Sequence, residues 1–75
     1  MRKVDTIKYS TLKLNVYDTG DVFAYDFRNS RSAEYVWRTA EEFKNNTVML
    51  FRWNCGFVPD TILSQIIDIC GLFRQ

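Results

Sequence analysis

Few side chains of this chain are suited to catalysis or to binding metal. The sequence contains no histidine, the commonest general base and metal ligand in proteins. Its two cysteines, Cys55 and Cys70, form no CxxC pair, and a structural zinc site needs four sulfur or nitrogen ligands. Neither a G-x-S-x-G motif nor a phosphate-binding loop is present. The sequence therefore predicts a protein without a metal or another cofactor.

The carboxylates that could form an acid–base pair have structural explanations. Glu41 and Glu42 belong to a T-x-x-E motif that starts at Thr39. This motif is typical of a helix N-terminus, where acidic side chains also favour the helix dipole. Asp18 and Asp21 lie in a predicted turn, a common position for aspartate. We therefore expect a protein without enzymatic activity.

Aromatic side chains are concentrated in the middle of the chain and have two interpretations. The set consists of Phe23, Tyr25, Phe27, Tyr35 and Trp37. Such a set could form a stacking platform for single-stranded nucleic acid on an open sheet. It could also form the core layer beneath the helices, which a domain of this size needs. We favour the core interpretation for the whole set.

The charge balance argues against a dedicated nucleic-acid-binding domain. Lysine and arginine total 10 and aspartate and glutamate total 9, a formal net charge of +1. Nucleic-acid domains usually carry a clear basic excess, because phosphate neutralisation supplies most of their non-specific affinity. No segment approaches the ~18 apolar residues that a membrane span needs, and the first residues do not form an apolar export segment. We expect a cytoplasmic protein with reduced, partly buried thiols.

Alternating polar and apolar residues predict a sheet in the first half of the chain. The segment 12–17 is the clearest, because Leu12, Leu14 and Val16 share one face while Tyr17 lies on the other. Further strands are predicted at 4–9, 22–27 and 33–38. Helical spacing competes in the last of these, and we prefer a strand because the capping motif follows it.

The second half of the chain predicts helices. A helix should begin at Thr39, and the apolar run Thr47–Trp53 fits either its continuation or a buried strand. Pro59 suits the first turn of a last helix. The apolar stripe of that helix, which we expect in the core, is Ile62, Leu63, Ile66, Ile67, Cys70 and Phe73. The predicted fold is a single α+β domain over residues 1–75, with an antiparallel sheet of three to four strands packed on one face by two helices.

Two short segments carry a resemblance to a known family. The segments Ile7–Thr11 (IKYST) and Leu14–Gly20 (LNVYDTG) resemble the N-terminal half of a small phage-encoded anti-CRISPR protein. That family inhibits the type I-F (Csy, Cascade-like) surveillance complex. The helix start at Thr39 and the amphipathic last helix follow the same order. The resemblance implies a four-stranded antiparallel sheet on two antiparallel helices, no enzymatic activity and a location in the host bacterial cytoplasm.

The resemblance also implies a binding mode. One sheet face of the family member binds the backbone (Cas7-type) subunits of the crRNA-guided complex and hinders hybridisation with target DNA. Two contact tyrosines of the family match Tyr9 and Tyr17, whereas a family acidic contact falls at Arg28 and does not carry over. Asp26 is the nearest carboxylate that could replace it. The candidate partner-binding residues are therefore Tyr9, Lys13, Asn15, Tyr17 and Asp26.

Other functions stay open at this point. The arginines around the second predicted turn, Arg28, Arg31 and Arg38, and the aromatic set are compatible with a small nucleic-acid-binding accessory protein. A phage or bacterial adaptor that binds another host enzyme, or that forms a homodimer, is equally compatible with the composition. Only the family resemblance favours the CRISPR inhibitor over this last alternative.

Overall fold

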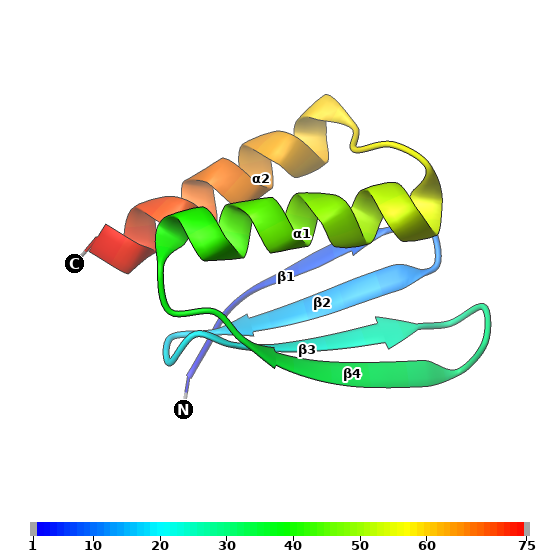
Figure 1. Cartoon of the computed structure of the whole chain (residues 1–75), viewed down its shortest axis with the longest axis horizontal. Helices are drawn as coiled ribbons and strands as arrows, with labels where there is room; N and C mark the ends of the chain where they lie inside the picture. Colours follow the sequence, from blue (N-terminus) through cyan, green and yellow to red (C-terminus); the bar gives the residue numbers. More distant parts are fainter. Residues whose placement is uncertain (1, 75) are drawn as a thin grey trace.

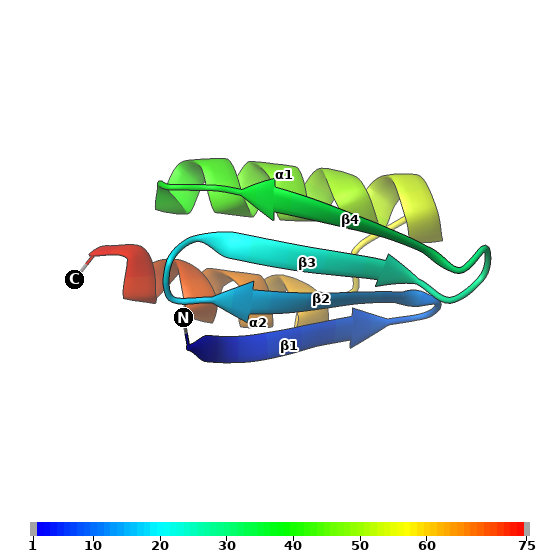
Figure 2. The same ribbon diagram turned by 90° about the horizontal axis from the view of Figure 1, so that it is seen from below.

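The computed structural model describes residues 2–74 and shows a four-stranded antiparallel sheet followed by two helices (Figure 1). The elements are β1 (Lys3–Tyr9), β2 (Leu12–Tyr17), β3 (Asp21–Asp26), β4 (Arg31–Val36), α1 (Ala40–Cys55), α2 (Asp60–Cys70) and the short 3-10 helix η1 (Gly71–Arg74). The strand order is β1-β2-β3-β4, so every strand pairs with its neighbours in the sequence. Both helices lie on one face of the sheet (Figure 2). The predicted α+β fold is confirmed.

The alternation along β2 divides the sheet into two faces. Its residues are buried and half-buried in turn, and the register places Leu14 between Ile7 of β1 and Ala24 of β3. Burying a Leu, Ile or Phe side chain contributes roughly 1.5–3 kcal/mol, so the helix-facing side supplies most of the packing energy. This core consists of Ile7, Leu12, Leu14, Val16, Val22, Ala24, Trp37, Phe43, Phe51, Ile62, Ile66 and Ile69.

The prediction that all five clustered aromatic residues belong to the core is wrong for three of them. Phe23, Tyr25 and Phe27 lie on the face that turns away from the helices, and Phe27 is 51% exposed. The small residues of β3, Val22 and Ala24, are the ones buried beneath the helices.

The other two aromatic residues are packed beneath the helices, as expected. Trp37 is buried and its ring stacks on Tyr35 with the centroids 5.0 Å apart. On its other side it meets Phe43 of α1 edge-on at 6.0 Å. Trp37 therefore joins the end of the sheet to the first helix.

Helix α1 begins where the capping motif predicts. The Thr39 hydroxyl accepts a hydrogen bond from the backbone N–H of Glu42 at 3.1 Å, and the Glu42 carboxylate accepts one from the backbone N–H of Arg38 at 2.9 Å. The helix continues without a break to Cys55, so the run Thr47–Trp53 is helical.

Helix α2 differs from the prediction in two details. Pro59 is the N-cap residue, and the first helical residue is Asp60. The buried residues are Ile62, Ile66 and Ile69, whereas Ile67 is 51% exposed and is wrongly predicted as core.

A polar contact connects α2 to the edge strand β1. The side-chain amide of Gln65 donates to the backbone carbonyl of Thr6 at 2.8 Å and to the Asp5 carboxylate at 3.1 Å. This contact joins residues about 60 positions apart in the sequence. It fixes the last helix over the first strand, since a charged acceptor strengthens such a hydrogen bond.

Gly20 occupies a crowded position in the turn between β2 and β3. Its φ is 89°, and its backbone carbonyl accepts a hydrogen bond from the N–H of Trp37 at 2.9 Å. A Cβ atom added at Gly20 would lie 2.5 Å from the Trp37 carbonyl oxygen. Both the positive φ and the close approach of a backbone group therefore require glycine here.

We expect Gly20→Ala to lower the free energy of unfolding by about 1–3 kcal/mol, because alanine is strained at positive φ and has no room. Urea denaturation followed by circular dichroism measures the change. Gly71→Ala is the matched control, since Gly71 has a helical φ of −59° and open space around it. Equal stabilities for the two variants would contradict the assigned role of Gly20.

Thr47 gives a prediction of the opposite sign. It is fully buried on α1, and its hydroxyl oxygen is a buried atom without a hydrogen-bond partner. We expect Thr47→Val to raise the free energy of unfolding by about 1 kcal/mol, because the shape is kept and an unsatisfied hydroxyl is removed. Thr61→Val, at an exposed position of α2, should change stability little. A clear loss of stability in Thr47→Val would show that its hydroxyl is satisfied in solution.

Candidate interaction surface

The sheet face that no helix covers, here called the open face, is the most distinctive surface of the molecule. The view from below shows the four strands in front of both helices (Figure 2). Strand register and burial assign residues of all four strands to this face, among them Thr6, Lys8, Lys13, Asn15, Tyr17, Asp21, Phe23, Tyr25, Phe27, Ser32, Glu34 and Val36. Five of them are aromatic or aliphatic, and the four aromatic ones meet in pairs, so these apolar side chains are contiguous and not scattered singly.

The aromatic rings of the open face form two edge-to-face pairs. The centroids of Tyr17 and Phe23 are 5.3 Å apart with the rings at 89°. Those of Tyr25 and Phe27 are 4.7 Å apart with the rings at 67°. Ring pairs of this geometry are held in place before any partner arrives, so little conformational entropy is lost on binding.

Two lysines make one end of the open face basic. Lys8 and Lys13 are direct cross-strand partners, and Lys13 also pairs with Tyr25. The ammonium nitrogen of Lys8 lies 5.9 Å from the ring centroid of Phe27, within range of a cation–π contact. Like charges placed opposite each other repel, so an acidic group on a partner would offset the repulsion between the two lysines.

Three of the sequence-predicted site residues lie together on the open face. Lys13, Asn15 and Tyr17 are alternate residues of β2 and point to the same side. The amide oxygen of Asn15 accepts a hydrogen bond from the Thr6 hydroxyl at 2.9 Å, which orients this side chain.

The expectation that Tyr9 belongs to the same exposed surface is wrong. Tyr9 shares its side of β1 with the buried Ile7 and pairs with the buried Leu12. It packs against the core, and its ring meets Phe57 edge-on at 5.8 Å. Tyr9 and Tyr17 therefore lie on opposite faces of the sheet and cannot contact one flat partner surface together.

Asp26 is also separated from the other candidates. It is buried on the helix-facing side, where its carboxylate accepts a hydrogen bond from the backbone N–H of Arg28 at 2.9 Å. Its second oxygen lies 3.8 Å from the Arg28 guanidinium. The carboxylate thus stabilises the turn after β3 and lies on the opposite side of the sheet from Lys13, Asn15 and Tyr17.

Several residues of the open face were not among the partner-binding candidates, and four of them make its aromatic and cation–π contacts: Lys8, Phe23, Tyr25 and Phe27. The sequence signal for them is ambiguous, because both sides of the segment 22–27 carry apolar residues. Their alignment with the polar side of β2 becomes visible only once the register is known.

The two thiols lie at the helix–sheet boundary. Cys55 is half-buried and its Sγ donates to the backbone carbonyl of Tyr9 at 3.8 Å, while that of Cys70 donates to the carbonyl of Ala40 at 3.5 Å. Burial raises the pKa of the Cys55 thiol, although a hydrogen bond with Ser10 and the charge of Arg28 act in the other direction. Cys55 is therefore protonated at neutral pH and is a weak nucleophile.

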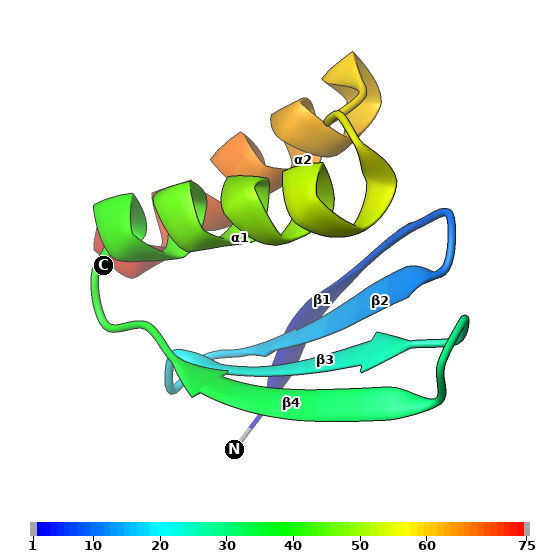
Figure 3. The same ribbon diagram turned by 45° about the vertical axis from the view of Figure 1, so that its right-hand side comes forward.

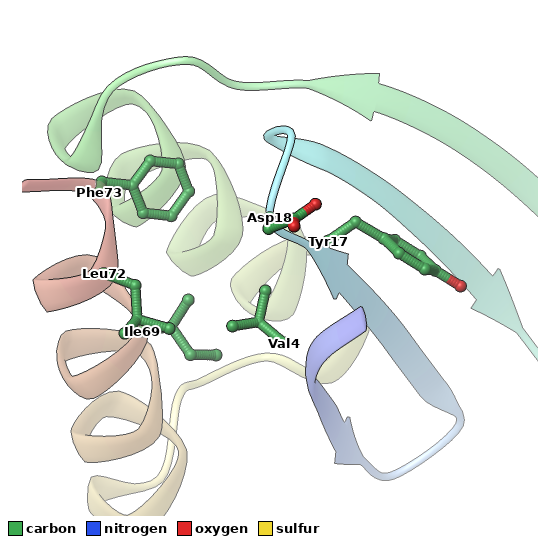
Figure 4. A pocket seen from close by; sticks show the side chains of 6 residues that line it. All are labelled: Val4, Tyr17, Asp18, Ile69, Leu72 and Phe73. Carbon is green, nitrogen blue, oxygen red and sulfur yellow. The ribbon is translucent and has the colours of Figure 1, made fainter. Parts of the chain in front are cut away.

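A small cavity of about 210 Å³ lies between the sheet and the end of the helical layer (Figure 4). It is lined by Val4, Tyr17, Asp18, Ile69, Leu72 and Phe73. Figure 4 shows the Tyr17 ring pointing away from Ile69 and Leu72. Asp18, the acidic residue of this lining, accepts a hydrogen bond from the backbone N–H of Arg2 at 3.1 Å. A single carboxylate with a structural partner gives this cavity no acid–base pair.

The described residues contain neither a metal site nor a membrane span. No three His, Cys, Asp or Glu side chains among residues 2–74 lie close enough together to hold a metal ion. In the same part of the chain, neither helix has the length and apolar character required to cross a bilayer.

Comparison with known proteins identifies no relative. No protein-family model matches this chain, and no curated protein or solved structure is significantly similar to it. The resemblance to the anti-CRISPR family therefore rests on the short segments between Ile7 and Gly20.

Proposed function

We propose that this chain is a non-enzymatic binding protein that attaches to another protein through its open face. The observation that carries the proposal is the pair of preformed aromatic contacts, uncovered by any helix and bordered by Lys8 and Lys13. Exposed tyrosine and phenylalanine rings are typical of the energetically dominant contacts of protein interfaces. The molecule measures 35 × 25 × 16 Å, so its broad side suits the ~800 Å² that each partner contributes to a standard interface.

The partner we propose is a type I CRISPR surveillance complex, bound in the host bacterial cytoplasm. The motifs of β1 and β2 support this choice, because they are the segments that resemble the phage anti-CRISPR family. In that family the sheet binds backbone (Cas7-type) subunits along the guide RNA. A protein seated there hinders hybridisation with target DNA by occupying space, without any chemical step.

Tyr17 provides the sharpest test of this proposal. We expect Tyr17→Ala to weaken binding to a purified type I-F complex by at least about tenfold, since the loss of an interface anchor costs about 2 kcal/mol or more. Surface plasmon resonance measures the affinity, and inhibition of target DNA binding gives a second readout.

The matched control is Ile67→Ser, because Ile67 is an exposed residue on the helical side. This variant should bind like the unmodified protein. Equal affinity for Tyr17→Ala and the unmodified protein would refute the open face as the binding surface. No binding of the complex by any variant would instead refute the proposed partner.

A second function is favoured by one specific observation. Tyr25 and Phe27 lie beside Lys8 and Lys13 on an open sheet. Proteins that bind single-stranded nucleic acid use this combination, because aromatic rings stack on the bases and lysines neutralise the phosphates. The formal net charge of +1 weighs against this function.

Fluorescence anisotropy with a labelled polythymidine oligonucleotide at low salt decides between the two functions. If nucleic acid binds, we expect Phe27→Ala and Lys8→Ala each to weaken binding, and the affinity to fall steeply as salt is added. No change in anisotropy at low salt would exclude this second function and leave the protein partner.

A further inference from the structure

Strand β4 is a free edge of the sheet. It pairs with β3 only, and no other strand lies beyond it within residues 2–74. The backbone N–H of Trp37 donates to the carbonyl of Gly20, which sets the phase of the β3–β4 ladder. In an antiparallel pair the hydrogen-bonded residues alternate. The backbone N–H and C=O groups of Ser32, Glu34 and Val36 therefore point outward, away from β3.

The two edge strands of the sheet differ in how far they are protected against pairing with strands of other chains. Strand β1 carries a bulge between Lys3 and Asp5 and a second lysine, Lys8, and these are features that prevent an edge from pairing with other chains. Strand β4 has neither a bulge nor a proline, and its six residues pair with β3 in unbroken register. Of the two edges, β4 is the one suited to accept another strand.

A groove runs along β4 on the helix-facing side, beneath α1. It consists of two cavities of about 280 and 230 Å³ that share Tyr35 and Leu50 in their linings. On this side of the sheet Ala24 is buried, whereas its partner on β4, Ala33, is exposed. Figure 3 shows α1 and β4 diverging toward the turn between β3 and β4. The helices therefore leave the inner side of β4 uncovered at Ala33, whereas Tyr35 is half-buried beneath them.

The α1 wall of this groove is apolar at its rim. Met49 is 46% exposed and Trp53 is 80% exposed, and both line the cavity next to Tyr35 and Trp37. A ligand that covers the groove would remove the large apolar ring of Trp53 from water, which favours binding.

We infer that this β4–α1 groove binds an extended peptide segment of another protein as a fifth strand of the sheet. The backbone of the peptide would hydrogen-bond to the outward groups of Ser32, Glu34 and Val36, and every second side chain would enter the groove. Those side chains are apolar, to match Met49 and Trp53. The peptide is acidic at its ends, because Arg31 and Arg38, both exposed, stand at the two ends of the edge.

A second copy of the chain does not fit this edge. Paired strands lie about 4.8 Å apart, whereas packed helices need about 8–10 Å between their axes. Helix α1 lies along the β4 side of the sheet (Figure 2), so pairing two β4 strands would force the two α1 helices into the same space. A single extended segment without a helical layer of its own avoids this clash.

The test uses a synthetic peptide and nuclear magnetic resonance of the isotope-labelled protein. The probe is a capped octapeptide in which valine alternates with threonine between terminal aspartates, long enough at roughly 3.3 Å per residue to span Arg31 to Arg38. We expect the amide resonances of Ser32, Glu34 and Val36 to shift and to gain protection from hydrogen exchange. Those of Ala33 and Tyr35, already bonded to β3, should gain none.

Variants separate this groove from the open face. Glu34→Pro removes one outward N–H, and Trp53→Ser removes the apolar rim, so each should weaken peptide binding by about tenfold or more. Glu34→Ala keeps the N–H and serves as the matched control, and Tyr17→Ala should bind the peptide normally. Each variant's amide spectrum verifies its fold. A lack of alternating protection, or equal binding by Trp53→Ser and the unmodified protein, would overturn the inference whatever the open face binds.

Discussion

One backbone hydrogen bond, from the N–H of Trp37 to the carbonyl of Gly20, sets the arrangement on which the other features depend. It requires a residue without a Cβ atom in the β2–β3 turn, because the two backbones are in contact there. Once it is formed, the phase of the β3–β4 ladder is determined. Trp37 then lies beneath the helices, and Glu34 and Val36 lie on the open face. The same phase determines which backbone N–H and C=O groups of β4 point away from β3. The core, the candidate interface and the free edge thus share one origin.

The parts of the fold that were predictable are those where a single periodicity dominates. Strand β2 has the predicted bounds, since Leu12, Leu14 and Val16 alternate with polar or amphipathic residues. The start of α1 was predictable because the cap at Thr39 is a local hydrogen bond. The segment 22–27 was correctly predicted as a strand, but its buried face was not predictable, because both of its faces carry apolar residues. The smaller side chains Val22 and Ala24 are the buried ones, and they share one closely packed core with the large rings Phe43 and Phe51 of α1.

Among the candidate site residues, too, those on a clearly alternating strand were placed correctly and the others were not. Lys13, Asn15 and Tyr17 were correctly grouped, because they occupy the polar side of the strand with the clearest alternation. Tyr9 and Asp26 were grouped with them from sequence proximity and motif resemblance, which carry no information about the face. In the weakly alternating β1, the side on which Tyr9 lies follows from its pairing with Leu12. Registers of this kind depend on contacts between strands, and a single sequence does not record them.

The contact of Gln65 with Asp5 and Thr6 has a consequence for biosynthesis. Each strand pairs with its neighbours in the sequence, so the hairpins of the sheet form from local contacts while the chain is still emerging from the ribosome. The apolar side of β1, however, is covered by α2, and the polar anchor Gln65 is the central residue of that helix. Until residues 60–70 have emerged, the nascent sheet exposes Ile7 and Leu14 to other chains. The interval before the last helix docks is therefore the period of greatest aggregation risk for this protein.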